Sequence, residues 1–200
     1  MPRPRSQAVR HAVLEAALEL LEQGGSRQLT MEGIAERADV SKQTVYRWWP
    51  SPAAVLMEAV NEKAATLVPD EDLGALAADL RAFVRRTVAS LRAGTAPIVA
   101  TLMAKAQLDE TFASLFRDQF IARRRQALRA LFERARDRGE IDPSTDLDLL
   151  VDIGFGTIWY RVLNRHAPLS RRFADQLADA LLTLAHRPGV IREDDAAGET

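Results

Sequence analysis

The stretch that decides the fold is Thr30–Pro50, TMEGIAERADVSKQTVYRWWP. Its first part carries apolar residues at the spacing of one helical face, namely Met31, Ile34, Ala35 and Ala38. Thr30 stands directly before that face, where an N-cap hydroxyl is favoured, and Ser41 stands in the same position before a second short helix. Pro50 disfavours helical geometry in the residue before it, so the second helix ends there. The stretch therefore predicts two short helices joined by a tight turn.

The second helix is too polar at its start to be a buried core helix. Its first turns present an ammonium, an amide, a hydroxyl and a guanidinium, from Lys42, Gln43, Thr44 and Arg47. These groups suit base edges and phosphates, and a helix-turn-helix places the first residues of its second helix in the major groove. We therefore interpret Ser41–Trp48 as a recognition helix. The spacing alone leaves an ordinary solvated helical hairpin open as the alternative.

Several short motifs around this stretch carry a family resemblance. In chain order they are Gly24-Gly25, Leu29-Thr30-Met31, Ile34-Ala35, Ala38, Val40-Ser41, Thr44, Val45-Tyr46 and Trp49-Pro50-Ser51. With them, the run from about Val9 to Val60 resembles the DNA-binding domain of the TetR (tetracycline repressor) family of bacterial transcription regulators. The sequence departs from the family pattern at Gly33, where a carboxylate is more frequent, and at Pro52, where a phosphate-contacting lysine is usual.

The resemblance implies an all-α protein that binds DNA. It would combine an N-terminal three-helix DNA-binding domain containing the helix-turn-helix with a C-terminal helical bundle for ligand binding and dimerisation. We predict a DNA-binding domain at 1–50, a connecting helix at 51–68, an effector-binding and dimerisation domain at 69–190, and a disordered tail at 191–200. The residues assigned to DNA are Thr30, Ser41, Lys42, Gln43, Thr44, Tyr46 and Arg47. Thr30, Ser41 and Tyr46 would position the module on the backbone, which fixes register without reading sequence.

The remainder of the chain has helical periodicity throughout, with no strand pattern and no internal repeat. The other predicted helices span about 6–23, 51–67, 72–93, 97–108, 109–139, 147–164 and 170–186. Residues 1–7 would form a basic arm before the first of them. Glycine inside a helix costs about 1 kcal/mol relative to alanine, so Gly154 and Gly156 predict close helix packing, a kink or room for a ligand.

In the resembling family, the last two helices pair with those of a second subunit as a four-helix bundle. We therefore predict a homodimer whose interface lies on the helices at 147–164 and 170–186. The residues assigned to the interface are Val151, Gly154, Ile158, Phe173, Leu177, Leu181 and Leu184. A two-fold dimer also suits a near-palindromic operator, because each subunit reads one half-site. A purely intrachain core is the alternative.

The resemblance also implies an effector cavity in the C-terminal half. The residues assigned to it are Phe83, Met103, Gln107, Phe116, Phe120, Phe155 and Trp159. An apolar pocket with a few polar groups is the usual form of a small-molecule site, so the expected effector is small and largely apolar. Plain core packing explains the same residues. We interpret Arg123-Arg124-Arg125 and Arg85-Arg86 as solvated faces.

Composition and motifs exclude several classes of protein. The chain has 47% hydrophobic and 28% charged residues, which is typical of a globular protein, and its net charge of −1 requires any DNA contact to come from a local patch. It has no cysteine, and its three histidines are far apart, so we predict no metal site. Neither a signal peptide nor an apolar run long enough for a membrane span is evident, which favours the cytoplasm.

No catalytic motif is present: the sequence contains no GxxxxGK[ST], GxGxxG, GxSxG or HExxH pattern. We therefore predict no enzyme activity and no cofactor. The function predicted from the sequence is a dimeric repressor that binds a near-palindromic operator and is released by a small-molecule effector. The alternative is a constitutive dimeric DNA-binding protein without an effector site.

Overall fold

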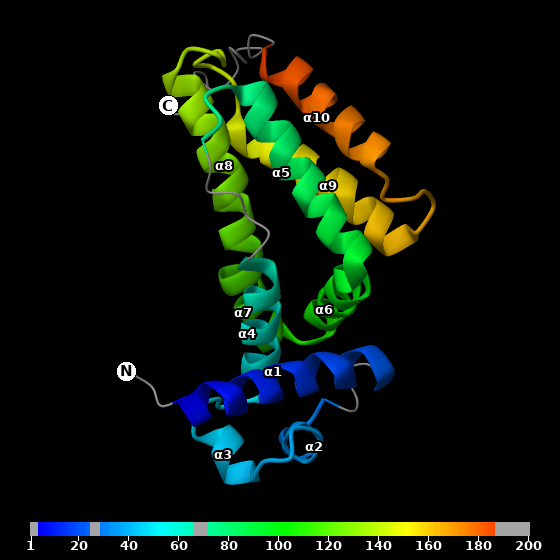
Figure 1. Cartoon of the computed structure of the whole chain (residues 1–200). Helices are drawn as coiled ribbons and strands as arrows, with labels where there is room; N and C mark the ends of the chain where they lie inside the picture. The colour runs from blue at the N-terminus through cyan, green and yellow to red at the C-terminus, as the bar shows by residue number, and fades with distance from the viewer. Residues whose placement is uncertain (1–3, 25–28, 66–71, 187–200) are drawn as a thin grey trace, which may run out of the picture. The chain divides into compact units, whose positions relative to one another are not determined.

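The computed structural model describes residues 4–24, 29–65 and 72–186, and these form helices and no strand. The α-helices are α1 Pro4–Gly24, α2 Met31–Arg37, α3 Lys42–Tyr46, α4 Pro52–Ala65, α5 Leu76–Ser90, α6 Ala96–Leu108, α7 Glu110–Phe116, α8 Ala122–Asp137, α9 Leu147–Asn164 and α10 Arg171–Ala185 (Figure 1). Two π-helical turns, η2 Leu91–Thr95 and η3 Arg117–Ile121, join α5 to α6 and α7 to α8. The predicted all-α fold is confirmed.

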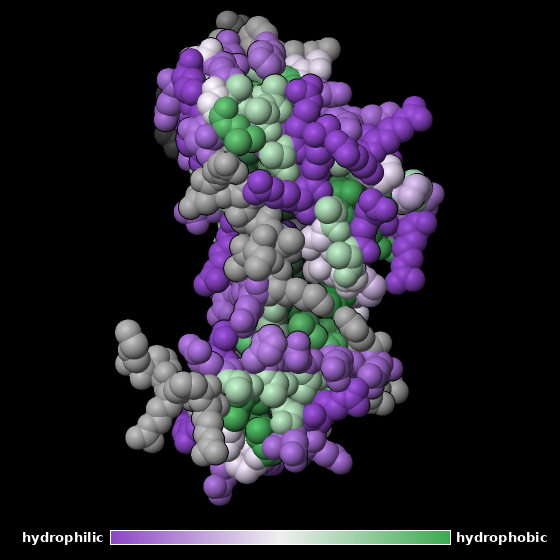
Figure 2. Space-filling model, in the orientation of Figure 1, coloured by the Kyte–Doolittle hydropathy of each residue, from purple (hydrophilic) through white to green (hydrophobic). Residues whose placement is uncertain are grey.

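The chain forms two compact units. Unit 1 comprises Met1–Val68 and Ser90–Arg124, and unit 2 comprises Pro69–Ala89 and Arg125–Thr200. One division, after residue 68, coincides with the predicted domain boundary, whereas residues 90–124 group with the N-terminal helices. The predicted tail at 191–200 lies outside the described residues. Figure 2 shows hydrophilic residues over most of the face in view, with hydrophobic residues in smaller areas.

Unit 1 is built around α1, which contacts α2, α4 and α6, while α2 contacts α3. Each of these helices turns an apolar face inward, and the buried side chains include Val13, Ala17, Leu21, Ile34, Val45, Trp49, Val55, Leu56 and Val60. The N-terminal three-helix core that the resemblance implies is therefore present. Residues 4–7, which we predicted to belong to a basic arm, instead form the first turn of α1.

Unit 2 packs α9 against α10. Its core contains the inner faces of its helices, including Leu80, Val84, Leu128, Leu131, Phe132, Val151, Ile158, Phe173, Leu177 and Leu181. Ion pairs on the surface join α5 to α10, with Arg81 at 2.7 Å from Asp179 and Arg85 at 2.5 Å from Asp175. The second of these pairs raises the pKa of Arg85 and lowers that of Asp175.

One π-turn lies at the end of the helix predicted at 72–93 and a second interrupts the helix predicted at 109–139, and periodicity shows neither. Gly94 in η2 has a φ of 110°, so the backbone leaves helical geometry near the predicted break. The predicted helix at 109–139 contains η3 between α7 and α8. The recognition helix is also shorter than predicted, because Arg47 and Trp48 follow α3 as a turn.

One helical stretch of the described residues, Leu76–Leu108, is long and apolar enough by length and composition to cross a membrane, whereas we predict no span from the sequence. This stretch is the continuous run α5–η2–α6, which Gly94 divides. Of its most apolar window, 39% is buried inside the protein, and core helices meet the same criterion. The stretch is therefore weak support for a membrane segment.

Candidate DNA-binding surface and ligand region

Local hydrogen bonds fix the turn of the helix-turn-helix. The Thr30 hydroxyl accepts the backbone N–H of Gly33 at 3.0 Å, which confirms the predicted N-cap of α2. At the other end of α2, Asp39 adopts the left-handed conformation with a φ of 52°. The N–H of Val40 then donates to the carbonyl of Ala35 at 3.0 Å. This is a Schellman ending with aspartate where glycine is usual.

The start of α3 holds polar side chains outward. Ser41 caps the helix, accepting the N–H of Thr44 at 3.2 Å, and Val45 is fully buried on the inner side. We define the α3 outer face as Lys42, Gln43, Tyr46 and Arg47, all of which are exposed. Thr44 is half-buried, and its hydroxyl lies 2.8 Å from that of Ser41. The structure thus brings the predicted DNA-binding residues of α3 onto one exposed surface, with Thr44 at its edge.

The side chains of the α3 outer face differ in whether they already have an interaction partner within the protein. Lys42 forms an ion pair with Glu32 of α2, and this hydrogen bond raises the pKa of Lys42 and lowers that of Glu32. The Lys42 ammonium also lies 5.5 Å from the centroid of the Tyr46 ring. In the described part of the chain, no side-chain hydrogen bond or ion pair engages Gln43 or Arg47. These two side chains are therefore available to an external partner.

A hydrogen-bonded frame supports α3 from behind. Trp49 is buried, and its indole N–H donates to Glu58 of α4 at 2.7 Å. Arg10 of α1 contacts the same carboxylate at 2.6 Å and Glu62 at 3.0 Å. Glu58 and Arg10 were not among the residues assigned to a site from the sequence. The position of Glu58 on the side of α4 that Trp49 meets was not visible in the sequence.

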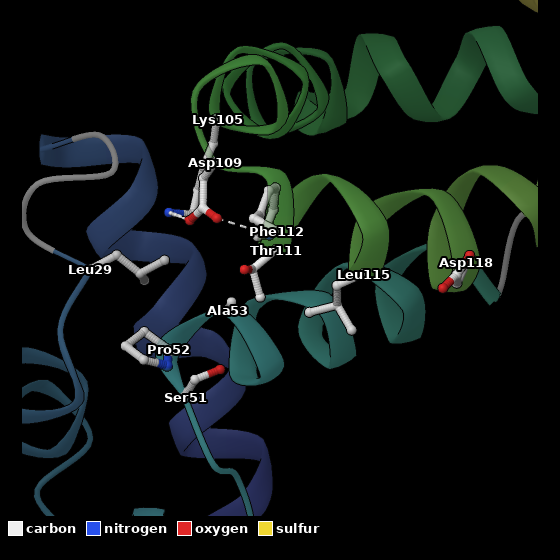
Figure 3. A pocket seen from close by; sticks show the side chains of 10 residues that line it. All are labelled: Leu29, Ser51, Pro52, Ala53, Lys105, Asp109, Thr111, Phe112, Leu115 and Asp118. Carbon is white, nitrogen blue, oxygen red and sulfur yellow. Dashed lines mark hydrogen bonds and ion pairs between the residues drawn. The ribbon is translucent and has the colours of Figure 1, made fainter.

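A cleft of about 510 Å³ lies within unit 1, beside the first turn of α4 (Figure 3). It is lined by Leu29, Ser51, Pro52, Ala53, Lys105, Asp109, Thr111, Phe112, Leu115 and Asp118. Asp109 caps α7, accepting the N–H of Phe112 at 3.0 Å, and this bond lowers the pKa of Asp109. Lys105 lies 3.3 Å from the same carboxylate. Sequence analysis did not find this cleft, whose lining comes from distant segments.

The residues predicted to line an effector cavity fall into two groups. In unit 2, the Phe155 ring lies 6.2 Å from Phe83 and 5.8 Å from Trp159. In unit 1, Phe116 and Phe120 stack at 5.1 Å. Met103, on α6, is half-buried, and Gln107 is exposed. None of these seven residues lines the cleft beside α4, and the predicted cavity stays a prediction.

The three arginines at 123–125 have three different environments. Arg123 is exposed, as predicted, and Arg125 pairs with Asp152. Arg124 lies with its guanidinium 4.6 Å from the centroid of the Phe120 ring, and its buried Nε has no hydrogen-bond partner. Burial lowers the pKa of Arg124. The interpretation of this run as a solvated face is therefore wrong for Arg124.

Six of the seven residues assigned to the dimer interface are buried inside unit 2, namely Val151, Gly154, Ile158, Phe173, Leu177 and Leu181. A Cβ on Gly154 would lie 3.3 Å from Leu128 and 3.4 Å from Leu181. Only Leu184, at 36% exposure, reaches the surface. Within the single chain these six residues lie in the core, and both their assignment to an interface and the pairing of subunits stay predictions.

The opposite side of α9 presents a second apolar stripe, which faces outward. We define the α9 outer face as Leu149, Ile153, Gly156, Tyr160 and Leu163, spaced three or four residues apart along one side of the helix. Leu149 is 55%, Tyr160 61% and Leu163 48% exposed. A Cβ on Gly156 would meet nothing within 4 Å. Sequence periodicity contained this stripe, but it did not tell which of the two stripes faces the core.

Two family models match the chain. The model described as bacterial regulatory proteins, tetR family, matches residues 13–59, and the one described as tetracyclin repressor-like, C-terminal domain, matches residues 70–181. The first match contains α2 and α3, and the second contains α9. Together the matches cover both the helix-turn-helix and most of the remaining helices.

Curated relatives agree with these matches. The uncharacterized HTH-type transcriptional regulator YdeS of Bacillus subtilis is 34% identical over 161 residues, which are 80% of this chain and 81% of that protein. The DNA-binding transcriptional repressor TetR of Mycobacteroides abscessus is 28% identical over 179 residues, which are 89% of this chain and 94% of that protein. Both similarities extend over more than four fifths of the relative's length.

Solved structures share the fold. The TetR family transcription regulator SCO0332 aligns with a TM-score of 0.67 and 33% identity, over 90% of this chain and 99% of that one. The transcriptional regulator FadR from Bacillus subtilis, solved in complex with stearoyl-CoA, aligns with a TM-score of 0.71 over 88% of this chain and 99% of that one. Its identity of 17% shows likeness of fold alone.

Proposed function

Since the chain belongs to the TetR family of bacterial transcription regulators, we propose that it is a repressor that binds a near-palindromic operator as a homodimer and is released by a small-molecule effector. The observation that carries the DNA-binding part is the α3 outer face, on which Gln43 and Arg47 are exposed and have no side-chain hydrogen bond or ion pair in the described part of the chain. We further propose that the protein acts in the cytoplasm, without a cofactor and without catalytic activity.

The α3 outer face supplies the chemistry that base reading requires. Gln43 offers an amide for adenine, and Arg47 offers a guanidinium for guanine or phosphate. To contact DNA, Lys42 must leave its ion pair with Glu32 and bind a phosphate or base instead. This is feasible because both side chains are exposed. The hydroxyls of Thr30 and Ser41 cap helices, and the hydroxyl of Thr44 contacts that of Ser41. Their remaining lone pairs and hydroxyl protons therefore position the module on the DNA backbone and do not read bases.

The α9 outer face supports a two-fold dimer. Exposed apolar residues in isolation are normal, but a continuous stripe on one helix face indicates a partner surface. The missing Cβ of Gly156 lets a second helix approach the centre of the stripe closely. Because a two-fold interface uses the same patch twice, two copies of the α9 outer face can cover each other. Leu184 of α10, also exposed, would extend this interface.

The effector part of the proposal rests on likeness and position. FadR from Bacillus subtilis holds stearoyl-CoA on this fold, which supports a ligand site in this chain. In unit 1, the first turn of α4 lines the cleft opposite α6 and α7, so a shift of those helices would reach α4 and the frame behind α3. An effector changes operator affinity only by its differential affinity for the two states.

Operator binding is tested by fluorescence anisotropy with DNA flanking the protein's own gene, over a salt series. We expect a dimer to bind one near-palindrome specifically, with affinity that falls steeply as salt rises because phosphate contacts release counterions. Arg47→Ala should weaken binding, whereas Arg123→Ala, which removes an exposed arginine elsewhere in unit 1, should not. Equal affinity for all sequences would contradict the repressor proposal and indicate an architectural protein.

A constitutive dimeric regulator is the second candidate, and one observation favours it. Phe83, Phe116, Phe120 and Phe155 are each at most 4% exposed, as in a filled core. The two candidates differ in one measurement, the affinity of the operator complex in the presence of a compound that binds the protein. If every tight-binding compound leaves that affinity unchanged, the constitutive candidate holds.

A further inference from the structure

No carboxylate among the described residues forms an ion pair with the guanidinium of Arg124. Its Nε is closed off from solvent and has no hydrogen-bond partner, and no ion pair reaches it from the described residues. Of the neighbouring arginines, Arg125 has Asp152 and Asp148 close by, and Arg123 is exposed to water. Arg124 as a whole is half-buried, but a polar N–H that is closed off from water without a partner is unfavourable, so the unpaired Nε indicates a role beyond packing.

Arg124 ends an aromatic row that runs along one side of α7, η3 and α8. Phe112 and Phe116 stack at 6.1 Å, Phe116 and Phe120 stack at 5.1 Å, and the Arg124 guanidinium lies over the Phe120 ring at 4.6 Å. The four residues are spaced four apart in the sequence. The π-turn η3, Arg117–Ile121, lies inside this row. π-turns within helices are rare, and those that occur are often found at functional sites.

From this arrangement, we propose that Arg124 binds the carboxylate of a small organic acid whose apolar body lies against the Phe120 end of the aromatic row. That the acid acts as the effector rests on the proposed function, whereas the binding itself does not. A carboxylate is planar and accepts two parallel hydrogen bonds from a guanidinium edge, and the edge that includes Nε holds the donor without a partner.

The apolar body is required by the surroundings of the guanidinium. Phe120 and the rings stacked behind it are buried and offer no hydrogen bonds to a hydrated anion. An anion that leaves water for this place needs compensation from apolar surface that is buried in the same step. A small inorganic anion such as phosphate brings no such surface, whereas an aliphatic or aromatic carboxylate does.

The closed position of Nε also couples binding to conformation. Because solvent does not reach Nε, a carboxylate reaches it only if the packing around Arg124 opens. The acid pairs with Nε only in an opened conformation. Its binding therefore favours that conformation over the closed one, in which Nε has no partner. The adjacent η3 turn is a place where the helix can change its hydrogen-bond register.

The binding test uses hexanoate, decanoate and 1-naphthoate, each with its matched alcohol and amine, by isothermal titration calorimetry on the full chain. We expect at least one acid to bind more tightly than both of its matched compounds. Arg124→Met should weaken that acid about tenfold to 100-fold, the range for a lost hydrogen bond to a charged group. Arg123→Met, the matched control on the same helix, should leave the affinity unchanged. Equal affinity for acid and alcohol, or no effect of Arg124→Met, would overturn the proposal.

A stability measurement separates a binding residue from a structural one. Without ligand, Arg124→Met removes a half-buried cation whose Nε lacks a hydrogen-bond partner, so we expect its Tm to rise by about 2–4 °C, while Arg123→Met leaves the Tm unchanged. A fall in Tm would show that Arg124 has a structural partner and would overturn the proposal. If an acid binds through Arg124 and leaves operator affinity unchanged, the binding site stands and the effector role fails.

Discussion

The α3 outer face and the α9 outer face are both exposed surfaces that the core of the single chain does not use. They differ in chemistry. The first presents an ammonium, an amide, a phenol and a guanidinium, and the second presents leucine, isoleucine and tyrosine around a glycine. The difference teaches that exposure alone does not identify a partner, whereas exposure together with chemistry does. A polar surface fits DNA, and an apolar stripe fits a second protein surface.

The two surfaces also depend on their supports in different ways. The α3 outer face sits on a helix of five residues, held by the Ser41 cap and by Val45 beneath it. The α9 outer face sits on a helix of eighteen residues whose inner side is packed along its length. A change beneath α3 should therefore alter the geometry of its outer face more easily than a change beneath α9.

The largest expected effect comes from charging the α9 outer face. Tyr160→Glu combined with Leu163→Glu places two carboxylates on the stripe, where a second copy would bury them. We expect the dimer to separate and operator affinity to fall about 100-fold to 10,000-fold, because each half-site then binds alone. Light scattering would give the oligomeric state, and fluorescence anisotropy would give the affinity.

The matched control for this pair is Ala78→Glu with Gln126→Glu, which adds the same charge at exposed positions of α5 and α8. It should leave the oligomeric state and the operator affinity near those of the parent protein. If the Tyr160 and Leu163 variant stayed dimeric, the second copy would have to use another surface, and the comparison between the two outer faces would fail.

The next effect separates the two glycines of α9. Gly154→Val forces a branched side chain against Leu128 and Leu181, and such overpacking costs about 1–3 kcal/mol in the free energy of unfolding. Gly156→Val meets open space in the single chain, so it should leave unfolding of the monomer nearly unchanged and weaken the dimer instead. Urea unfolding at several protein concentrations would check both. Similar losses for the two variants would mean that both faces of α9 are packed within the chain.

An effect of about the same size tests base reading by the α3 outer face. Gln43→Ala should cost about 1–3 kcal/mol on the cognate operator and relax the preference at one base position. Competition anisotropy with operator variants would measure both quantities. Gln126→Ala removes an exposed glutamine from α8 and serves as the control. A uniform loss on all sequences would show that Gln43 positions the helix and reads no base.

The smallest expected effect concerns the turn beneath the α3 outer face. Asp39 holds a φ of 52°, a conformation that glycine adopts without strain and most residues avoid. Asp39→Gly should therefore raise the free energy of unfolding by about 0.5 kcal/mol, with operator affinity retained. Asp39→Asn, which tolerates this conformation, should be neutral. A loss of stability in Asp39→Gly would indicate that the Asp39 carboxylate itself stabilises the turn.

The fold was predictable because its determinants are local. Thr30 and Ser41 were visible as N-caps in the sequence, and each accepts a backbone N–H of the helix that follows it. Asp109, Asp146 and Ser170, at or next to the predicted starts of their helices, are N-caps of the same kind in the structure. Apolar periodicity gave the helices, and their observed ends differ from prediction by a few residues. The polar start of the recognition helix gave the candidate DNA-binding surface in the same way.

What the sequence could not give depends on tertiary packing. The helix α9 has two apolar stripes, and periodicity cannot decide whether Gly154 or Gly156 faces the core when both neighbourhoods are apolar. Three consecutive arginines point in three directions, so the burial of Arg124 required the fold. The bond from Trp49 to Glu58 joins two segments whose relative orientation no local pattern contains.

The bond from Trp49 to Glu58 also attaches α4 to the segment after α3 at one point along its length. Glu58 is near the midpoint of α4, Pro52–Ala65, whose fourteen residues extend about 21 Å. A rigid rod held at its midpoint behaves as a balanced lever, with arms of about 10 Å here. When one end of such a rod is displaced, the other end moves by about the same distance in the opposite direction. A tilt of α4 by about 10° about Glu58 would move its two ends by about 2 Å in opposite directions. Such a pivot would reverse the direction of a motion without amplifying it.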